Sequence, residues 1–80
     1  SLLRMLETGR YLRRGYQDIL SAHDDLAAIG KPPPEAQAIR VKREYDAACD
    51  LVAGYEADWE ARRALHPSVF EALTDTPILR

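Results

Sequence analysis

A proline-rich segment near the middle of the chain constrains the fold more than any other feature. Gly30 is followed by Lys31 and by prolines at positions 32–34. Proline lacks a backbone N–H and its ring clashes with the preceding helical turn, so no helix can run through this segment. Glycine suits the residue just after a helix end, and Pro34 suits the first turn of a new helix. We therefore predict a turn over residues 30–34.

Apolar residues on both sides of this turn recur at the spacing of three and four that is typical of helices. The pattern extends over about residues 2–29 and again over about residues 35–65. Each stretch covers about four heptads, which is long enough to indicate coiled-coil-like packing. A short turn makes sequential helices antiparallel neighbours, so the sequence predicts an all-α helical hairpin.

The second helix is predicted to end at the pair His66–Pro67, because a residue before proline is pushed out of the helical conformation. Pro67 then suits the first position of a short third helix over about residues 67–74. Residues 75–80 would form a tail. Together these elements predict a single domain over residues 1–80.

One seam on each helix is predicted to face the other helix. On the first helix the seam is Met5, Thr8, Leu12, Gly15, Ile19, Ala22, Leu26 and Ile29. On the second helix it is Ala38, Val41, Tyr45, Ala48, Val52, Tyr55, Trp59 and Arg62. The preferred register places a small residue opposite a large one in several layers, with Gly15 opposite Val52, as close packing requires.

The first helix has a second apolar stripe beside this seam, formed by Leu2, Leu6, Tyr16, Leu20, His23 and Ala27. A stripe this wide needs two neighbours, and symmetric homodimers are the commonest oligomers. We therefore predict a homodimeric four-helix bundle with Tyr16, Leu20, His23 and Ala27 at the interface. Tyr11 lies off the seam and is predicted to be an exposed contact residue. The alternative is a monomer in which the third helix and tail fold back over the stripe.

Size and composition narrow the class of protein. A chain of 80 residues has a core that supplies only about 3–5 kcal/mol of stability, so it often needs a partner. Cys49 is the single cysteine and makes no intrachain disulfide, which favours a reducing compartment. No apolar run approaches the length of a membrane span, and no leader-like segment is recognisable at the start. We expect a cytoplasmic protein that does not enter membranes.

Residues suited to catalysis or to metal binding are too scattered to predict either. His23 and His66 lie far apart, and Cys49 has no second cysteine nearby, so metal-ligand spacing is missing. A nucleophilic Cys49 would need a base and a lowered thiol pKa, and a free cysteine is more often a small hydrophobic residue. We predict no catalytic residue, no metal and no cofactor. An enzyme with its site between subunits is a remote third reading.

Two basic clusters leave one alternative open. They consist of Arg10, Arg13 and Arg14 on the first helix and of Arg40, Lys42 and Arg43 on the second. The formal net charge is −2, so no overall field attracts nucleic acid, although a dimer could combine the clusters. The preferred interpretation is a non-enzymatic interaction or assembly module that self-associates and docks another, unidentified protein. The alternative is a dimeric nucleic-acid-binding regulator.

Overall fold

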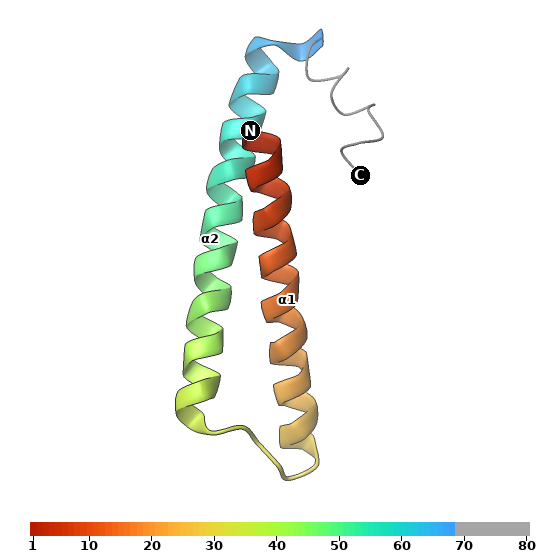
Figure 1. Ribbon diagram of the computed structural model, residues 1–80, viewed down its shortest axis with the longest axis vertical. Coiled ribbons are helices and arrows are strands. Elements are labelled where there is room, and N and C mark those ends of the chain that lie inside the picture. Colours follow the sequence, from red (N-terminus) through yellow and green to blue (C-terminus); the bar gives the residue numbers. More distant parts are fainter. Residues whose placement is uncertain (69–80) are drawn as a thin grey trace.

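The computed structural model describes residues 1–68, which form two long antiparallel helices and no strand (Figure 1). Helix α1 spans Leu2–Ala28, and helix α2 spans Glu35–Leu65. The predicted all-α hairpin is therefore confirmed, with α1 ending one residue earlier than expected. Most of the predicted third helix and all of the predicted tail lie outside the described residues.

The turn between the helices has the conformation that its glycine predicts. Gly30 has a φ of 77°, in the left-handed region that a side chain disfavours. Its N–H donates to the carbonyl oxygen of Ala27 at 3.1 Å, and the N–H of Lys31 donates to that of Leu26 at 2.8 Å. This pair of bonds is the Schellman motif, which satisfies the last carbonyl groups of α1.

Helix α2 begins directly after the prolines and ends where His66 was predicted to stop it. Pro34 is the N-cap residue, one position before the first helical turn, and makes no side-chain capping bond. Glu35 in the first turn places a negative charge at the positive end of the helix dipole. At the other end, the N–H of His66 donates to the carbonyl oxygen of Arg62 at 3.0 Å.

The side of α2 that faces α1 is the predicted one. Its buried and half-buried residues include Ala38, Val41, Tyr45, Ala48, Val52, Tyr55 and Trp59. These residues recur at alternating intervals of three and four, which keeps them on one face of the helix. Only Arg62, the last member of the predicted seam, is exposed.

The side of α1 that faces α2 differs from the predicted one. The least exposed residues at seam spacing are Leu2, Leu6, Gly9, Arg13, Tyr16, Leu20 and His23. A Cβ atom on Gly9 would lie 3.0 Å from Cγ2 of Val52, whereas one on Gly15 would meet nothing within 4 Å. The predicted pairing of Gly15 with Val52 is therefore wrong. Gly9 occupies the place opposite Val52, because a residue without a side chain lets the helices approach there.

The core of the hairpin is thin. Over the described residues, the buried hydrophobic side chains are Leu2, Leu6, Val41, Ala48 and Val52. A two-helix layer can cover only one side of each helix, so the large apolar residues of α1 that lie beside the seam remain partly open.

Candidate interaction surface

A row of large apolar side chains runs along α1 beside the seam. Met5, Leu12, Ile19 and Leu26 recur every seventh residue and are 47%, 45%, 42% and 40% exposed. Seven residues are almost two helical turns, so the four side chains lie on one side of the helix. They are the residues that the sequence predicted for the inner seam. Thus the stripe that was predicted to face α2 is exposed, and most of the stripe that was predicted to be exposed faces α2.

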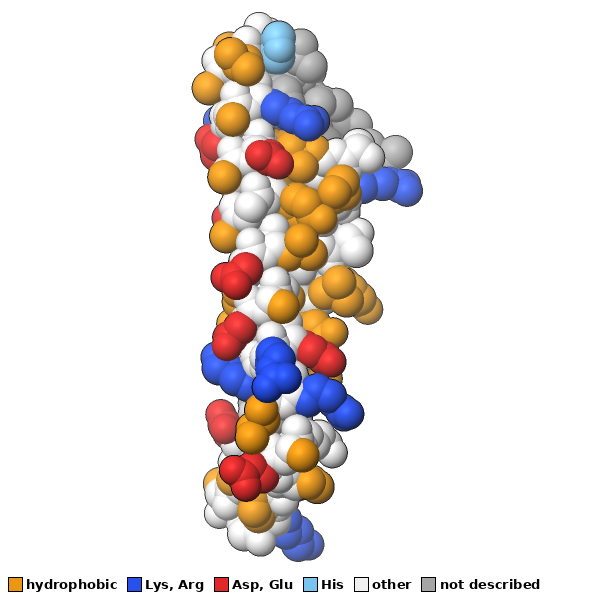
Figure 2. All heavy atoms as spheres, turned by 90° about the vertical axis from the view of Figure 1, so that its left-hand side faces the viewer, with side chains coloured by type: hydrophobic (Ala, Val, Ile, Leu, Met, Phe, Trp, Pro, Cys, Tyr) orange, Lys and Arg blue, Asp and Glu red, His pale blue; other side chains and the backbone are white. Residues whose placement is uncertain are grey.

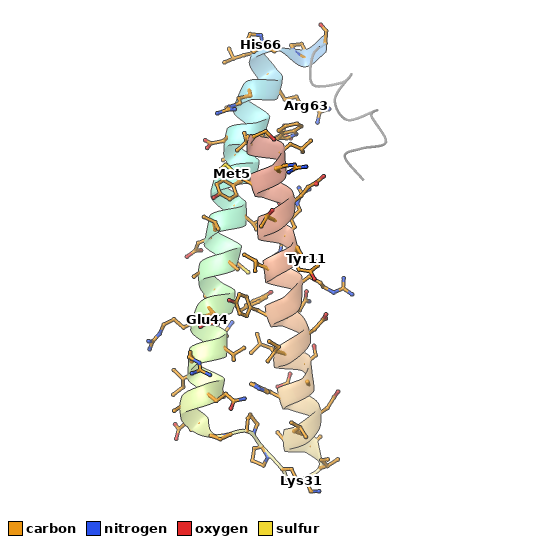
Figure 3. The ribbon with its side chains drawn as sticks, viewed as in Figure 1. Met5, Tyr11, Lys31, Glu44, Arg63 and His66 are labelled. Atoms are coloured by element: carbon orange, nitrogen blue, oxygen red, sulfur yellow. The ribbon has the colours of Figure 1, made fainter. Side chains whose placement is uncertain are left out.

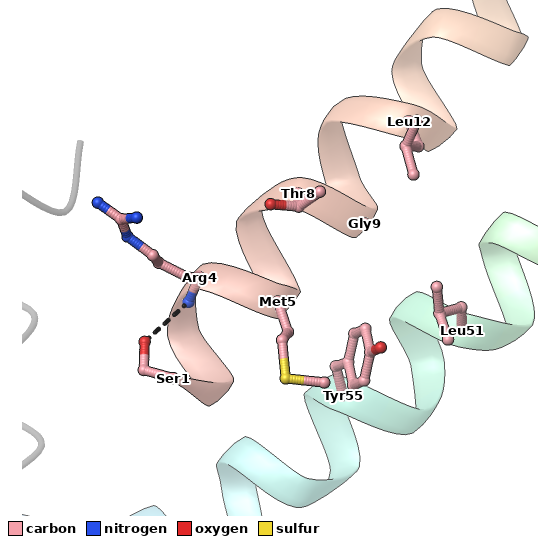
Figure 4. Close-up of a pocket in the computed structure, with 8 residues that line it drawn as sticks. All are labelled: Ser1, Arg4, Met5, Thr8, Gly9, Leu12, Leu51 and Tyr55. Carbon is pink, nitrogen blue, oxygen red and sulfur yellow. Dashed lines mark hydrogen bonds between the residues drawn. The ribbon is translucent and has the colours of Figure 1, made fainter.

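Helix α2 contributes to the same side of the hairpin. Leu51 is 46% exposed and, together with Leu12 and Ala47, lines a shallow hollow between the helices. A neighbouring hollow is lined by Met5 of α1 and by Tyr55 of α2, among others. Figure 4 shows the Met5 side chain reaching toward the Tyr55 ring and Leu12 opposite Leu51. We call this side, with the Met5 row of α1 and Leu51, Ala47 and Gly54 of α2, the open face.

Small residues lie between the large ones on the open face. On α1 they are Thr8, Gly15 and Ala22, and on α2 they are Ala47, Gly54 and Ala61. A Cβ atom on Gly15 or on Gly54 would meet nothing within 4 Å. Glycine inside a helix costs about 1 kcal/mol relative to alanine, and contacts within the hairpin do not explain these two. Such residues allow another backbone to approach closely.

The opposite face of the hairpin is charged. Arg10 of α1 pairs with Glu56 of α2 at 3.4 Å, and both side chains are about half exposed. Farther along α2, Lys42 pairs with Asp46 at 3.0 Å and lies over the Tyr45 ring, 5.2 Å from its centroid. Figure 2 shows hydrophobic side chains gathered in the upper half of the molecule, while charged side chains spread over the side of α2 toward the viewer. The open face is therefore the more apolar of the two, although Arg4 and Glu44 line its hollows.

Two neighbouring side chains of α2 have shifted pKa values. Hydrogen bonding to the Cys49 sulfur, followed by charge interaction with it and by desolvation, raises the pKa of Tyr45. The hydrogen bond to Asp46 and the attraction of its carboxylate raise the pKa of Lys42. Both shifts favour the protonated form of the side chain, so neither Lys42 nor Tyr45 is suited to accept a proton as a general base.

The residues predicted for the interface do not form one surface. Tyr11 is 80% exposed and lies on the side of α1 away from α2 (Figure 3). Tyr16, Leu20 and His23 are half-buried on the seam, and Ala27 is exposed. An interface made of the three seam residues would require the hairpin to open.

His23 shows how the seam becomes polar near the turn. Its Nε2 lies 3.5 Å from Nε2 of Gln37 on α2, and its buried Nδ1 has no hydrogen-bond partner. The imidazole therefore spans the gap between the helices at this level. It contributes to the seam mainly by packing its ring.

Three of the six side chains in the two basic clusters form ion pairs with carboxylates, among them Lys42 with Asp46. Arg10 pairs with Glu56, and Arg14 pairs with Asp18 at 3.3 Å. Arg13 is half-buried on the seam.

Residues 1–68 contain neither a metal-binding cluster nor a membrane-spanning helix. This part of the chain contains no group of three or more His, Cys, Asp or Glu side chains that could hold a metal ion. Neither α1 nor α2 is long and apolar enough to cross a membrane.

Comparisons with known proteins do not assign a family. No family model matches the chain, and no match is found among curated proteins or among solved structures. The function must therefore be inferred from the surfaces of the hairpin itself.

Proposed function

We propose that this protein is a non-enzymatic assembly module in which two hairpins pack through their open faces to form a four-helix bundle. The observation that carries the proposal is the row Met5, Leu12, Ile19 and Leu26, whose side chains are 40–47% exposed on one side of α1. A surface helix of a stable monomer buries such a stripe against its own chain. Here the hairpin leaves it open.

The amount of exposed surface supports a second copy as the occupant. The chain has a solvent-accessible surface of 6120 Å². A compact monomer of its mass would have about 4,850 Å². The excess of roughly 1,300 Å² exceeds the ~800 Å² that each partner contributes to a standard protein interface. The excess is therefore large enough to supply one copy's share of a standard interface.

The shape of the molecule points the same way. Its radius of gyration is 16.9 Å, whereas a compact chain of 80 residues would have about 11.6 Å. The extents are 53 × 22 × 16 Å, so the hairpin is one layer of helices thick. Stable domains are built from at least two packed layers, and a second hairpin supplies the second layer.

A partner with the same surface fits because the open face carries both halves of a complementary contact. The large side chains are concentrated on α1, and the small ones of α2, Ala47 and Gly54, face the same way. A twofold contact places the same surface of both copies against each other, so large and small residues are available on both sides. The biological role would then be that of an accessory subunit or adaptor, with the bundle rather than the hairpin as the working unit.

The proposal is tested by unfolding the full chain at several protein concentrations. If folding is coupled to dimer formation, the midpoint of thermal unfolding, followed by circular dichroism, rises with concentration from about 1 to 100 μM. A midpoint that does not change over this range, together with a monomeric mass, would contradict self-association.

A further inference from the structure

We propose that the turn end of the hairpin is a pH-sensitive element, in which protonation of His23 loosens the packing of α1 against α2. The turn end comprises the last turns of α1, residues 20–28, the turn itself, and the first turns of α2, residues 35–41. All of these residues belong to one chain. The proposal therefore does not depend on self-association and can fail or hold without it.

His23 lies on the seam with one polar neighbour. The residue is half-buried, as is Leu20 one turn earlier on α1, while Val41 on the seam of α2 is buried. The Nε2 atom of His23 lies 3.5 Å from Nε2 of Gln37, and its Nδ1 atom is buried without a hydrogen-bond partner. The two nitrogens of the ring thus lie in different environments.

A neutral imidazole fits these environments at moderate cost. The exposed amide of Gln37 can turn its oxygen toward the ring, so that Nε2–H of His23 donates to it and Nδ1 carries no hydrogen. The group that remains unsatisfied is then a single uncharged acceptor atom. Packing of the ring between the helices can offset such a loss.

A protonated imidazole has no equally good arrangement. Both ring nitrogens then carry a hydrogen, so Nδ1–H of His23 becomes a charged donor that is buried without an acceptor. Burying a charge without a partner costs far more than burying a neutral polar atom. Separation of α1 and α2 at this level lets water reach Nδ1, so protonation favours the open form of the turn end.

The charges around His23 do not offset this cost. Arg40 lies one turn after Gln37 on α2 and Lys31 lies in the turn, and both disfavour a second positive charge nearby. Asp24 and Glu35 are one and two residues from His23 and Gln37, so they point to other sides of their helices. The positions one turn away on α1 are uncharged, namely Ile19, Leu20, Leu26 and Ala27. None of the ion pairs among residues 1–68 involves His23.

The direction of the pH dependence follows from which form the packed hairpin disfavours. An imidazole in an unfolded chain takes up its proton near about pH 6.5, whereas carboxylates do so near about pH 4. Because the packed seam disfavours the protonated ring, the stability is fully present above about pH 6.5 and is lost as the pH falls below it. The range from about pH 7.5 to about pH 5.5 therefore isolates the histidines.

Thermal unfolding of the full chain at one protein concentration tests the proposal. Between about pH 7.5 and about pH 5.5, the midpoint followed by circular dichroism should fall by about 5 °C. His23→Gln, which cannot be protonated, should lose most of this dependence, and His23→Leu provides a second variant that fills the seam. His66→Gln removes the other histidine of the chain, which is exposed, and should retain the full loss. A natural chain without the loss, or a His23→Gln or His23→Leu variant that keeps it, would overturn the proposal.

Hydrogen exchange of the natural chain locates the effect. At the lower pH, the protection factors of amides in residues 20–26 and 40–42 should fall by about tenfold, because these residues form the turn end. Amides around Gly9 and Val52, at the other end of the seam, should change by less than about threefold. Equal loss of protection at both ends would contradict a local element at the turn.

Discussion

Gly9 of α1 and Val52 of α2 lie so close that a methyl carbon on Gly9 would be only 3.0 Å from Cγ2 of Val52. The ring of Tyr55 is the next neighbour, at 3.7 Å. Val52 is completely buried, so its side chain has little freedom to move away. This contact fixes both the spacing and the register of the two helices.

Substitution of Gly9 by alanine should therefore destabilise the hairpin. Overpacking of a buried contact typically costs 1–3 kcal/mol, while the better helix propensity of alanine returns up to about 1 kcal/mol. We expect a net loss of about 1 kcal/mol in the free energy of unfolding, measured by urea denaturation. Gly15→Ala is the matched control, because its Cβ meets nothing within 4 Å, and should not lower stability. Equal effects of the two substitutions would contradict the observed register.

Much of this architecture was predictable from the sequence. The three prolines and Gly30 determine the turn, and the His66–Pro67 pair ends α2. The seam of α2 was also identified correctly as far as Trp59, because its members recur at alternating intervals of three and four. Local rules of proline, glycine and helical periodicity are sufficient for such features.

The inner face of α1 was assigned wrongly for a physical reason. Its apolar stripe is wide, and a single neighbouring helix can cover only one part of it. Periodicity favours Met5 and Leu12 because they are large and apolar, whereas the observed seam includes the polar residues Arg13 and His23. The choice depends on the close contact at Gly9, which no pattern within α1 alone reveals. As a result, the open face was missed as a candidate surface.

Stability should decrease at alkaline pH because of Tyr45 and Lys42. The pKa of each is raised in the folded chain, Tyr45 chiefly by hydrogen bonding to Cys49 and Lys42 chiefly by its hydrogen bond to Asp46. A raised pKa gives stability that is fully present below the unfolded value, about 10 to 10.5, and is lost as pH rises through the folded value. The midpoint of thermal unfolding should therefore fall above about pH 10.

Tyr45→Phe separates the two contributions, since it removes one titrating group and leaves Lys42 in place. Its unfolding midpoint should depend less steeply on pH than that of the natural chain, whereas Tyr11→Phe, at an exposed position, should not change the dependence. A profile that is flat up to about pH 11 would show that these groups do not contribute.

Glu44 provides a test of the interface that does not depend on deleting a contact. This residue lines the hollow that also contains Leu12 and Leu51, so a second copy would remove it from water. Burying a carboxylate without a partner is costly. Glu44→Gln should therefore tighten self-association by about tenfold, corresponding to ~1.4 kcal/mol.

The matched control for this substitution is Glu60→Gln, which removes the same charge from an exposed residue that pairs with Arg63 at 3.8 Å. Dissociation constants for both variants can be measured by sedimentation equilibrium. If Glu60→Gln tightens the dimer as much as Glu44→Gln, the effect reflects net charge alone and the open face is not the interface.

The most direct test of the central claim compares Leu12→Glu with Tyr11→Glu by sedimentation equilibrium. The two positions are adjacent on α1, but Leu12 lies on the open face and Tyr11 lies on the side of α1 away from α2. A charge buried by dimerisation should weaken association by more than 100-fold, or about 2.7 kcal/mol. We predict that Leu12→Glu sediments as a monomer at concentrations where the natural chain and Tyr11→Glu are dimers. A dimeric Leu12→Glu, or a monomeric natural chain, would contradict the account.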